Sequence, residues 1–297
     1  MNMLWGFQLE LKQSLRTKKL WVILGIMMLL YIPTLYITKS SMVMSGEEIT
    51  NVGDAVMVLI DNINGLGGFF ISMLALLMGA TAINSEIEKG TLRVAMSKPI
   101  TRISYIGGKF AAHAVILLLA LLLTTIVSII GLSWLGAPIT GELFKESLLF
   151  NMLLLLAMIQ LVALGYIMST YIKSSSAALG AALAIFFVVF MIMPTIVQFM
   201  LIKDYIANPE QPVNWEEIQQ RQKEYTTRYL FYVPTKQIDI IVGDASKVSG
   251  DFMNPQREYL GLGYAIKKNL INLGILVGMT GLYLVLAFHR FLRMDLR

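Results

Sequence analysis

Six long apolar stretches, none of which contains Asp, Glu, Lys or Arg, constrain the fold of this sequence more than any other feature. They run roughly through residues 20–37, 66–83, 110–135, 148–172, 177–202 and 270–288. A helix needs about 20 apolar residues to cross the hydrocarbon core of a bilayer, which is about 30 Å thick. The pattern therefore predicts an all-α polytopic membrane protein, with six transmembrane helices in a single transmembrane domain that spans residues 1–297.

The composition agrees with extensive contact to lipid. Of the 297 residues, 56% are hydrophobic and only 14% are charged, whereas a soluble domain carries about 25% charged residues. The sequence has no cysteine, which excludes a disulfide scaffold and thiolate metal sites. Lys and Arg residues flank the apolar stretches and do not gather in a basic patch, so we expect a lipid bilayer, and no nucleic acid, as a partner.

The distribution of basic residues predicts the orientation. Lys and Arg are concentrated before the first stretch, in the 84–109 loop and after the last stretch, whereas the two short loops on the other side are acidic. Short loops rich in Lys and Arg stay in the cytoplasm. We therefore expect a multi-pass protein of the cell (cytoplasmic) membrane, with both termini and the 84–109 loop cytoplasmic. Lys267 and Lys268 argue against this orientation, but they belong to a long segment, and long segments largely escape the rule.

The segment before the first span, residues 1–19, has the pattern of an amphipathic helix. Leu4, Phe7 and Leu11 form an apolar stripe, with Lys12 and Arg16 on another face. Such a helix lies in the membrane interface with its apolar face in lipid. It would act either as an anchor that sets the topology or as a moving part.

The long segment before the last span, residues 203–268, is expected on the extracytoplasmic side. Asn214 and Glu217 resemble a capping box, and Trp215 and Tyr225 belong to a series of large side chains at near-helical spacing. We expect a helical cap on the outer membrane surface. It would brace the neighbouring spans or help to close an exit path.

The residues of the 84–109 loop predict a short helix between two turns. Gly90 is expected to end the preceding helix, Pro99 prevents continuation, and the hydroxyls of Thr91 and Thr101 can cap the helices that follow them.

Within this short helix, Leu92 and Met96 share an apolar face and Arg93 lies opposite. We expect the apolar face to project toward the cytoplasm, because exposed apolar surface beyond a bilayer marks a protein partner. The nearby charged side chains would form charge-assisted pairs with that partner. An ordinary loop with solvated charges is the alternative.

The sequence EIEKGTLR at residues 86–93, followed by SKPITR at residues 97–102 and by Gly108-Lys109, resembles the same loop of type-two ABC exporter permeases. Members of this family carry an E-x-E-x-G-T-L-R motif and then an S-x-P-x-x-R motif after the second span. The resemblance also includes the amphipathic N-terminal helix, the six spans and the long connection before the last span. It covers nearly the whole chain.

The resemblance implies the membrane-spanning permease subunit of an ATP-driven ABC exporter. The loop would hold a coupling helix that docks on a separate ATPase subunit, and the turn at residues 173–176 would make a second, smaller contact. Two permease chains would pair as a homodimer or heterodimer, with the second and fifth spans facing each other. ATP and Mg²⁺ would bind to the partner ATPase. The residues assigned to coupling are Glu86, Glu88, Gly90, Thr91, Leu92, Arg93, Met96, Pro99 and Arg102.

The sequence contains no pattern for catalysis on this chain. A phosphate-binding P-loop requires G-x-x-x-x-G-K-[ST], and the nearest match, Gly108-Lys109, has Ile103 at the first glycine position and Phe110 after the lysine. We expect no enzyme activity, no cofactor and no metal on this chain, and we expect His113 to be a hydrogen-bonded residue. A membrane anchor or scaffold that tethers an ATPase or another partner, without moving cargo, is the alternative function.

Polar and small residues within the spans have two interpretations each. Asn151, Gln160 and Gln198 would line a polar path or form hydrogen bonds between helices. Phe187 lies in a stretch rich in Phe and Met, which suits a lipophilic cargo or a lipid-facing surface. The small-residue pairs allow close approach of helices, within one chain or between two; they are Gly180/Ala184 and Gly274/Gly278.

Overall fold

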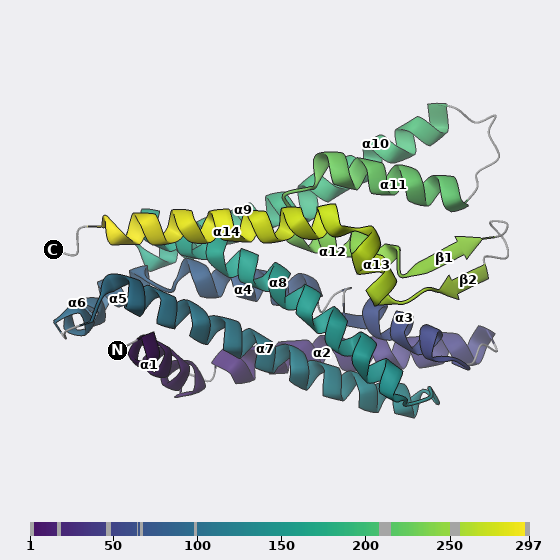
Figure 1. Cartoon of the computed structure of the whole chain (residues 1–297), viewed down its shortest axis with the longest axis horizontal. Coiled ribbons are helices and arrows are strands. Elements are labelled where there is room, and N and C mark those ends of the chain that lie inside the picture. Colours follow the sequence, from purple (N-terminus) through teal and green to yellow (C-terminus); the bar gives the residue numbers. More distant parts are fainter. Residues whose placement is uncertain are drawn as a thin grey trace.

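The computed structural model shows an elongated bundle of helices that run mostly along one direction (Figure 1). It describes residues 3–16, 19–45, 49–63, 65, 68–97, 100–207, 215–249 and 256–294. The first helix, the last turns of the final helix, and α5 and α6 lie together at one end, which we call the terminal end. The opposite end carries α3 and the two strands, and we call it the hairpin end.

The chain is almost entirely helical in the described ranges. The helices are α1 (Met3–Arg16), α2 (Lys19–Ser45), α3 (Val52–Asn62), α4 (Gly68–Ala80), α5 (Asn84–Glu88), α6 (Thr91–Met96), α7 (Arg102–Trp134), α8 (Gly141–Tyr171), α9 (Ser175–Phe187), the π-helical turn η2 (Val188–Ile192), α10 (Met193–Ala207), α11 (Trp215–Tyr229), α12 (Pro234–Gly243), α13 (Leu262–Lys268) and α14 (Leu270–Leu292). The strands β1 (Ser246–Ser249) and β2 (Gln256–Tyr259) form an antiparallel pair.

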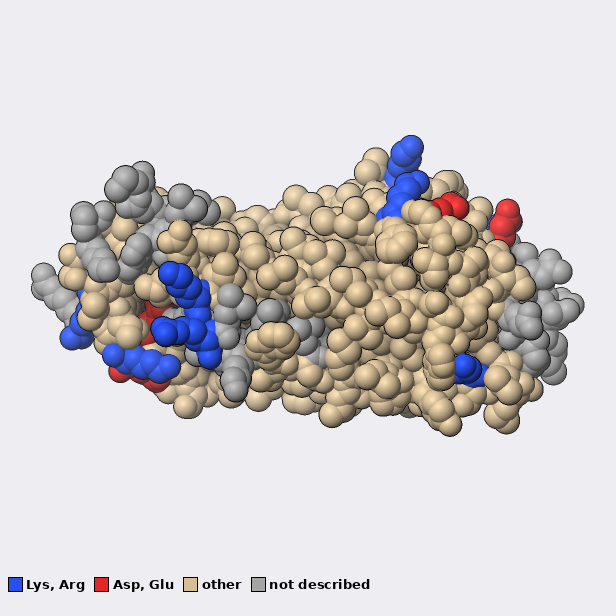
Figure 2. Space-filling model, turned by 90° about the horizontal axis from the view of Figure 1, so that it is seen from below, with Lys and Arg blue, Asp and Glu red and all other residues tan. Residues whose placement is uncertain are grey.

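Within the described part of the chain, four helical segments are long and apolar enough to cross a membrane. They are α7, α8, the continuous segment Ser175–Asp204 formed by α9, η2 and α10, and α14. Helix α2 has 27 residues, whereas the apolar helix α4 has only 13 and is therefore about 20 Å long. Figure 2 shows charged residues toward the two ends of one face, with none on the described surface between them, as a membrane-spanning bundle requires.

The second apolar stretch does not form the single helix that its sequence predicts. Helix α4 ends at Ala80, and a turn at residues 81–83 separates it from α5. The hydroxyl of Ser169 on α8 accepts hydrogen bonds from the backbone N–H groups of Ile83 and Asn84, at 2.8 and 3.1 Å. This side chain therefore satisfies donors that an uninterrupted helix would pair internally.

The centre of the bundle is the contact between α4 and α8, where two glycines bring the helix backbones together. A Cβ atom on Gly79 would lie 2.3 Å from the carbonyl oxygen of Val162, and one on Gly165 would lie 2.4 Å from that of Leu76. A Cβ atom on Gly180 would meet nothing within 4 Å, and the same holds for the glycines of the second small-residue pair. Of the two interpretations of those pairs, close packing within the chain is therefore wrong, and contact between two chains stays a prediction.

The hairpin end is not the purely helical cap that the sequence predicts, because β1 and β2 form part of it. Glu146 of α8 is buried and accepts hydrogen bonds from the Tyr259 hydroxyl at 2.7 Å and the Leu262 N–H at 2.8 Å. Burial, followed by the neighbouring Glu146 carboxylate, raises the pKa of Tyr259. Helix α11 does run over the expected residues, whereas Asn214 of the expected capping box lies outside the described residues.

The α4–α8 contact predicts a clear difference between two glycine substitutions. Gly165→Ala should lower the apparent unfolding temperature in lipid nanodiscs, because the new methyl group overlaps backbone atoms and such overpacking costs about 1–3 kcal/mol. Gly180→Ala, which has free space, should leave that temperature unchanged or raise it, because Ala favours a helix by about 1 kcal/mol over Gly. Equal effects of the two substitutions would contradict the close contact.

Candidate functional site

The 84–109 loop begins with two short helices joined by a left-handed turn. Gly90 has a φ of 69°, a conformation that glycine adopts without the strain that a Cβ atom brings. Thr91 is the first residue of α6 and not its cap, since its hydroxyl donates to the carbonyl of Glu86 at 3.3 Å. Thr101 does cap α7, because its hydroxyl accepts from the N–H of Ser104 at 3.2 Å. Pro99 lies outside the described residues.

The apolar face of α6 points into the protein, so the expectation that it projects outward is wrong. Leu92 is only 1% exposed, and it belongs to the same core cluster as Ala95. The side chains that do reach the surface lie on the opposite face: Val94 is 66% exposed, and Arg93 is exposed beside it. Periodicity reveals an apolar face but not what covers it, and here the chain itself covers it.

Beneath this loop lies a buried cluster of charged side chains from three helices. Lys109 of α7 is 2% exposed, and its Nζ lies 2.7 Å from Oε1 of Glu86 on α5 and 2.7 Å from Oε2 of Glu10 on α1. Both carboxylates are also buried. One ammonium group therefore joins two carboxylates that are 76 positions apart in the sequence.

The cluster continues on both sides through polar side chains. The hydroxyl of Tyr105 donates to Oε2 of Glu86 at 2.5 Å. On the other side, Nε2 of His113 lies 3.0 Å from Oε1 of Glu10, and Nδ1 of the same ring lies 3.1 Å from the Tyr166 hydroxyl on α8. Because a carboxylate only accepts hydrogen bonds, Nε2 of His113 carries a proton. The result is one continuous polar chain through α5, α7, α1 and α8.

Helical spacing explains how α7 and α1 present these groups. Tyr105, Lys109 and His113 are four residues apart, so they share one face of α7. On α1, Gly6 precedes Glu10 by four residues, and a Cβ atom on Gly6 would lie 2.8 Å from the carbonyl oxygen of Tyr105. The glycine therefore lets the backbone of α1 approach α7 closely enough for Glu10 to reach Lys109.

Sequence reasoning missed Glu10, Tyr105 and Tyr166, and it treated Lys109 only as part of a motif. The signal that was available is the row of polar residues at four-residue spacing where α7 begins. Glu86 was assigned to an external partner, but it is 4% exposed and serves inside the chain. His113 is hydrogen-bonded, as predicted.

Further hydrogen bonds attach the loop to α9 and α14. Oε1 of Glu88 accepts from the backbone N–H of Ser175 at 2.7 Å, so the turn before α9 touches the loop. The guanidinium of Arg102 donates to the carbonyls of Leu292 and Met294, at 3.0 and 2.8 Å. These carbonyls lie at the last residue of α14 and just beyond it, where orphan acceptors favour a cation. Arg102 was also assigned to an external partner, and it too acts within the chain.

The face of α1 that carries Gly6 and Glu10 packs on α7, while the expected apolar stripe is only partly covered. Phe7 and Leu11 are half-buried, and Lys12 and Arg16 are exposed; the side chain of Leu4 lies outside the described residues. Helix α1 is therefore fixed to the bundle through one face and leaves its charged face free.

The residues considered for a polar path fall into two groups. Asn151 is buried and exchanges hydrogen bonds with Thr125 of α7 at 2.8 and 3.0 Å, which joins two helices of one chain. Gln160 is buried in α8. Phe187 is 44% exposed and Gln198 is exposed, both on the segment formed by α9, η2 and α10.

Among the described residues, no group of three or more His, Cys, Asp or Glu side chains is placed to hold a metal ion.

The chain is similar to membrane proteins of ABC transporters. The family described as ABC-2 family transporter protein matches residues 4–296. The chain is 27% identical, over 71% of its length and 75% of the relative's, to a probable ABC transporter permease protein, NosY, of Stutzerimonas stutzeri. A protein with the same description from Pseudomonas aeruginosa is 31% identical over 45% of this chain and 49% of its own length.

The buried cluster predicts that Lys109 is essential for stability. Lys109→Met should destabilise the protein by about 3–5 kcal/mol, because it leaves two carboxylates buried without their cation. Lys12→Met, at an exposed position on α1, should change stability by less than about 0.5 kcal/mol. Thermal unfolding in nanodiscs compares the two variants.

A further variant separates charge from packing. Adding Glu10→Gln and Glu86→Gln to Lys109→Met removes the unpaired charges and should recover much of the lost stability. If Lys109→Met alone unfolds at the same temperature as Lys12→Met, the cluster does not stabilise the fold.

Proposed function

Since the chain belongs to the ABC-2 transporter family and is a membrane permease subunit of an ABC transporter, we propose that it exports cargo by converting the motion of a separate ATPase into motion of its own helices. The observation that carries the proposal is the buried Glu10–Lys109–Glu86 cluster directly beneath an exposed docking surface. ATP and Mg²⁺ bind to the partner ATPase, and this chain supplies the path.

The docking surface consists of the exposed side chains of α5 and α6. Ile87 is 39% exposed and Val94 is 66% exposed, and the charged side chains of Lys89 and Arg93 are exposed beside them. An apolar centre with basic neighbours suits a protein partner whose cleft is apolar and acidic at its rim. The turn before α9, which touches Glu88, lies next to this surface and provides the second contact.

Motion passes from the docking surface through fixed connections. The charged cluster joins α5 to α1 and α7, and Arg102 joins the start of α7 to the end of α14. A displacement of α6 therefore moves α5, α1 and α7 together, since separating these three would leave a buried charge without its partner, and the hydrogen bonds of Arg102 connect α14 to them. Such a rigid unit can carry a displacement from the ATPase into the membrane.

The terminal end faces the cytoplasm in this proposal. The basic residues before α2, around α5 to α7 and after α14 meet the positive-inside rule in that orientation, and both termini are then cytoplasmic. Helix α2 and the α4–α5 segment complete six spans with the four long apolar segments. The cap formed by α11, α12, the hairpin and α13 then lies on the outer surface, where it braces α8 and α10.

A second permease chain covers the segment formed by α9, η2 and α10. In the membrane-spanning window of Ser175–Asp204 only 17% of the residues are buried, against 61% for α8. Its exposed side chains include Phe187 and Phe199. A homodimer or heterodimer formed through this face would place the fifth span of each chain beside the path.

The docking surface is tested by replacing one exposed apolar side chain with a charged one. Val94→Asp should weaken association with the ATPase by at least tenfold in co-purification or binding measurements, because truncating or charging a central apolar contact costs about 1–2 kcal/mol or more. The unfolding temperature of the permease should not change, since the side chain contacts solvent in the free chain.

Ile139→Asp provides the matched control, because Ile139 is an exposed apolar residue at the hairpin end. It should leave ATPase association unchanged. Unaltered association of the Val94→Asp variant, in a preparation where the wild-type chain binds the ATPase, would show that α6 does not form the docking surface.

A further inference from the structure

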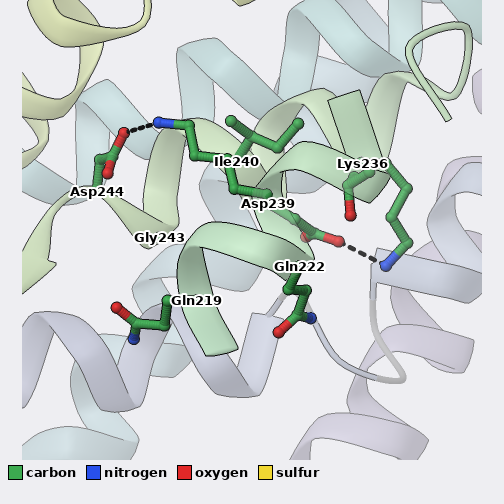
Figure 3. A pocket seen from close by; sticks show the side chains of 9 residues that line it. Gln219, Gln222, Lys236, Asp239, Ile240, Gly243 and Asp244 are labelled. Carbon is green, nitrogen blue, oxygen red and sulfur yellow. Dashed lines mark hydrogen bonds and ion pairs between the residues drawn. The ribbon is translucent and has the colours of Figure 1, made fainter. Parts of the chain in front are cut away.

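Two neighbouring hollows at the hairpin end share one wall. The first, of about 220 Å³, lies between α11 and α12 (Figure 3). The second, of about 450 Å³, lies between α11, β1 and α13. The shared wall includes Lys223, Asp244 and Gln219. The larger hollow falls within the range of about 300–1,000 Å³ that is typical of small-molecule sites.

The shared wall is held together by hydrogen bonds to one carboxylate. Asp244 accepts from the ammonium group of Lys223, from that of Lys268 at 2.9 Å, and from the Asn269 side-chain amide at 2.7 Å. Burial pushes the pKa of Asp244 upward, but these hydrogen bonds outweigh it and hold the pKa below its usual value. The hydrogen bond to Asp244 in turn raises the pKa of Lys268. Asp244 and Lys268 are therefore both charged at neutral pH, and Asp244 fixes the positions of both lysines.

The two hollows differ in charge. In the first, Lys236 pairs with Asp239 at 2.6 Å, as Figure 3 shows, so its lining is balanced. In the second, the ammonium groups of two lysines, Lys223 and Lys268, share a single carboxylate, that of Asp244. The excess of positive charge, together with amide and hydroxyl donors from the same walls, favours an anion in the larger hollow.

The position of the larger hollow indicates where the anion comes from. Lys268 comes two residues before Leu270, the first residue of the apolar helix α14. Leu270 and Ile271 are 62% and 81% exposed, and Tyr264 on the rim is 49% exposed. Exposed apolar residues at a span end, with Lys and Tyr beside them, mark the level of lipid headgroups.

We propose that the larger hollow binds a phosphate group, supplied by an anionic phospholipid at the membrane surface of the hairpin end. Lys223 and Lys268, oriented by Asp244, hold the phosphate oxygens. The acyl chains lie along the exposed start of α14. The lipid thereby ties α11, β1 and α13 of the cap to the bilayer.

The test measures the unfolding temperature of the detergent-purified chain during separate titrations with short-chain phosphatidylglycerol, phosphatidylcholine and inorganic phosphate. Phosphatidylglycerol should raise the temperature saturably, and the zwitterionic phosphatidylcholine should do so weakly. The variant Lys223→Gln/Lys268→Gln should bind phosphatidylglycerol about tenfold more weakly, because a neutral amide forms weaker hydrogen bonds to phosphate than an ammonium group does. The control Lys236→Gln, in the balanced hollow, should bind like the wild type.

Each outcome either supports or excludes a phospholipid site in the larger hollow. If inorganic phosphate alone gives the same saturable effect, the ligand is a soluble phosphate compound and the lipid source is wrong. If neither ligand acts on the wild type, or if the double variant responds equally, the site does not exist. Should the double variant not fold, the single variant Lys268→Gln keeps the Lys223–Asp244 pair and should weaken phosphatidylglycerol binding several-fold, while an unchanged response would overturn the proposal.

Discussion

The position of Lys109 between Glu10 and Glu86 is the constraint on which the rest of the structure depends. Three charged groups from α1, α7 and α5 lie almost out of reach of solvent, where an unpaired charge is far more costly than in water. None of the three helices can move away from the others without leaving such a charge behind. They therefore behave as one body, even though α1 contacts the rest of the bundle mainly through α7.

This constraint also fixes the start of the 84–109 loop, because Glu86 on α5 belongs to the buried cluster. Helix α6 packs against α5, and its apolar face lies in the core cluster, so only the opposite face remains for a partner. The contact between Gly79 and Gly165 joins α4 to α8 at the bundle centre. The segment of α9, η2 and α10 is different, because it is sparsely buried and contains a π-helical turn, a feature that often accompanies functional bending. Displacement of the body against this segment is the motion that the proposed export requires.

The sequence predicted those features that depend on local chemistry. The turn at Gly90 and the cap at Thr101 follow from backbone freedom and from hydroxyl capping, and both are present. The sequence did not predict which side of α6 faces the protein interior, nor which charged residues pair with one another. Leu92 and Glu86 fit an outward-facing docking helix as well as an inward-facing one, and only the tertiary packing decides between them. Glu10 could not be paired with Lys109 by spacing, because 99 positions separate them. The β-hairpin within the cap was not predicted, because its strands, SKVS and QREY, are short, mostly polar and show no clear apolar alternation.

The most direct test of the single-body account is the distance between α1 and α6 through the nucleotide cycle. The chain has no cysteine, so spin labels at Lys12→Cys and Ser97→Cys report only those two exposed sites, in a nanodisc complex with the ATPase. The account predicts a narrow distance distribution that is the same with and without ATP, whereas a label at Phe199→Cys on α10 shifts relative to Ser97→Cys. A distance between α1 and α6 that changes with nucleotide, while Lys109 is intact, would contradict it.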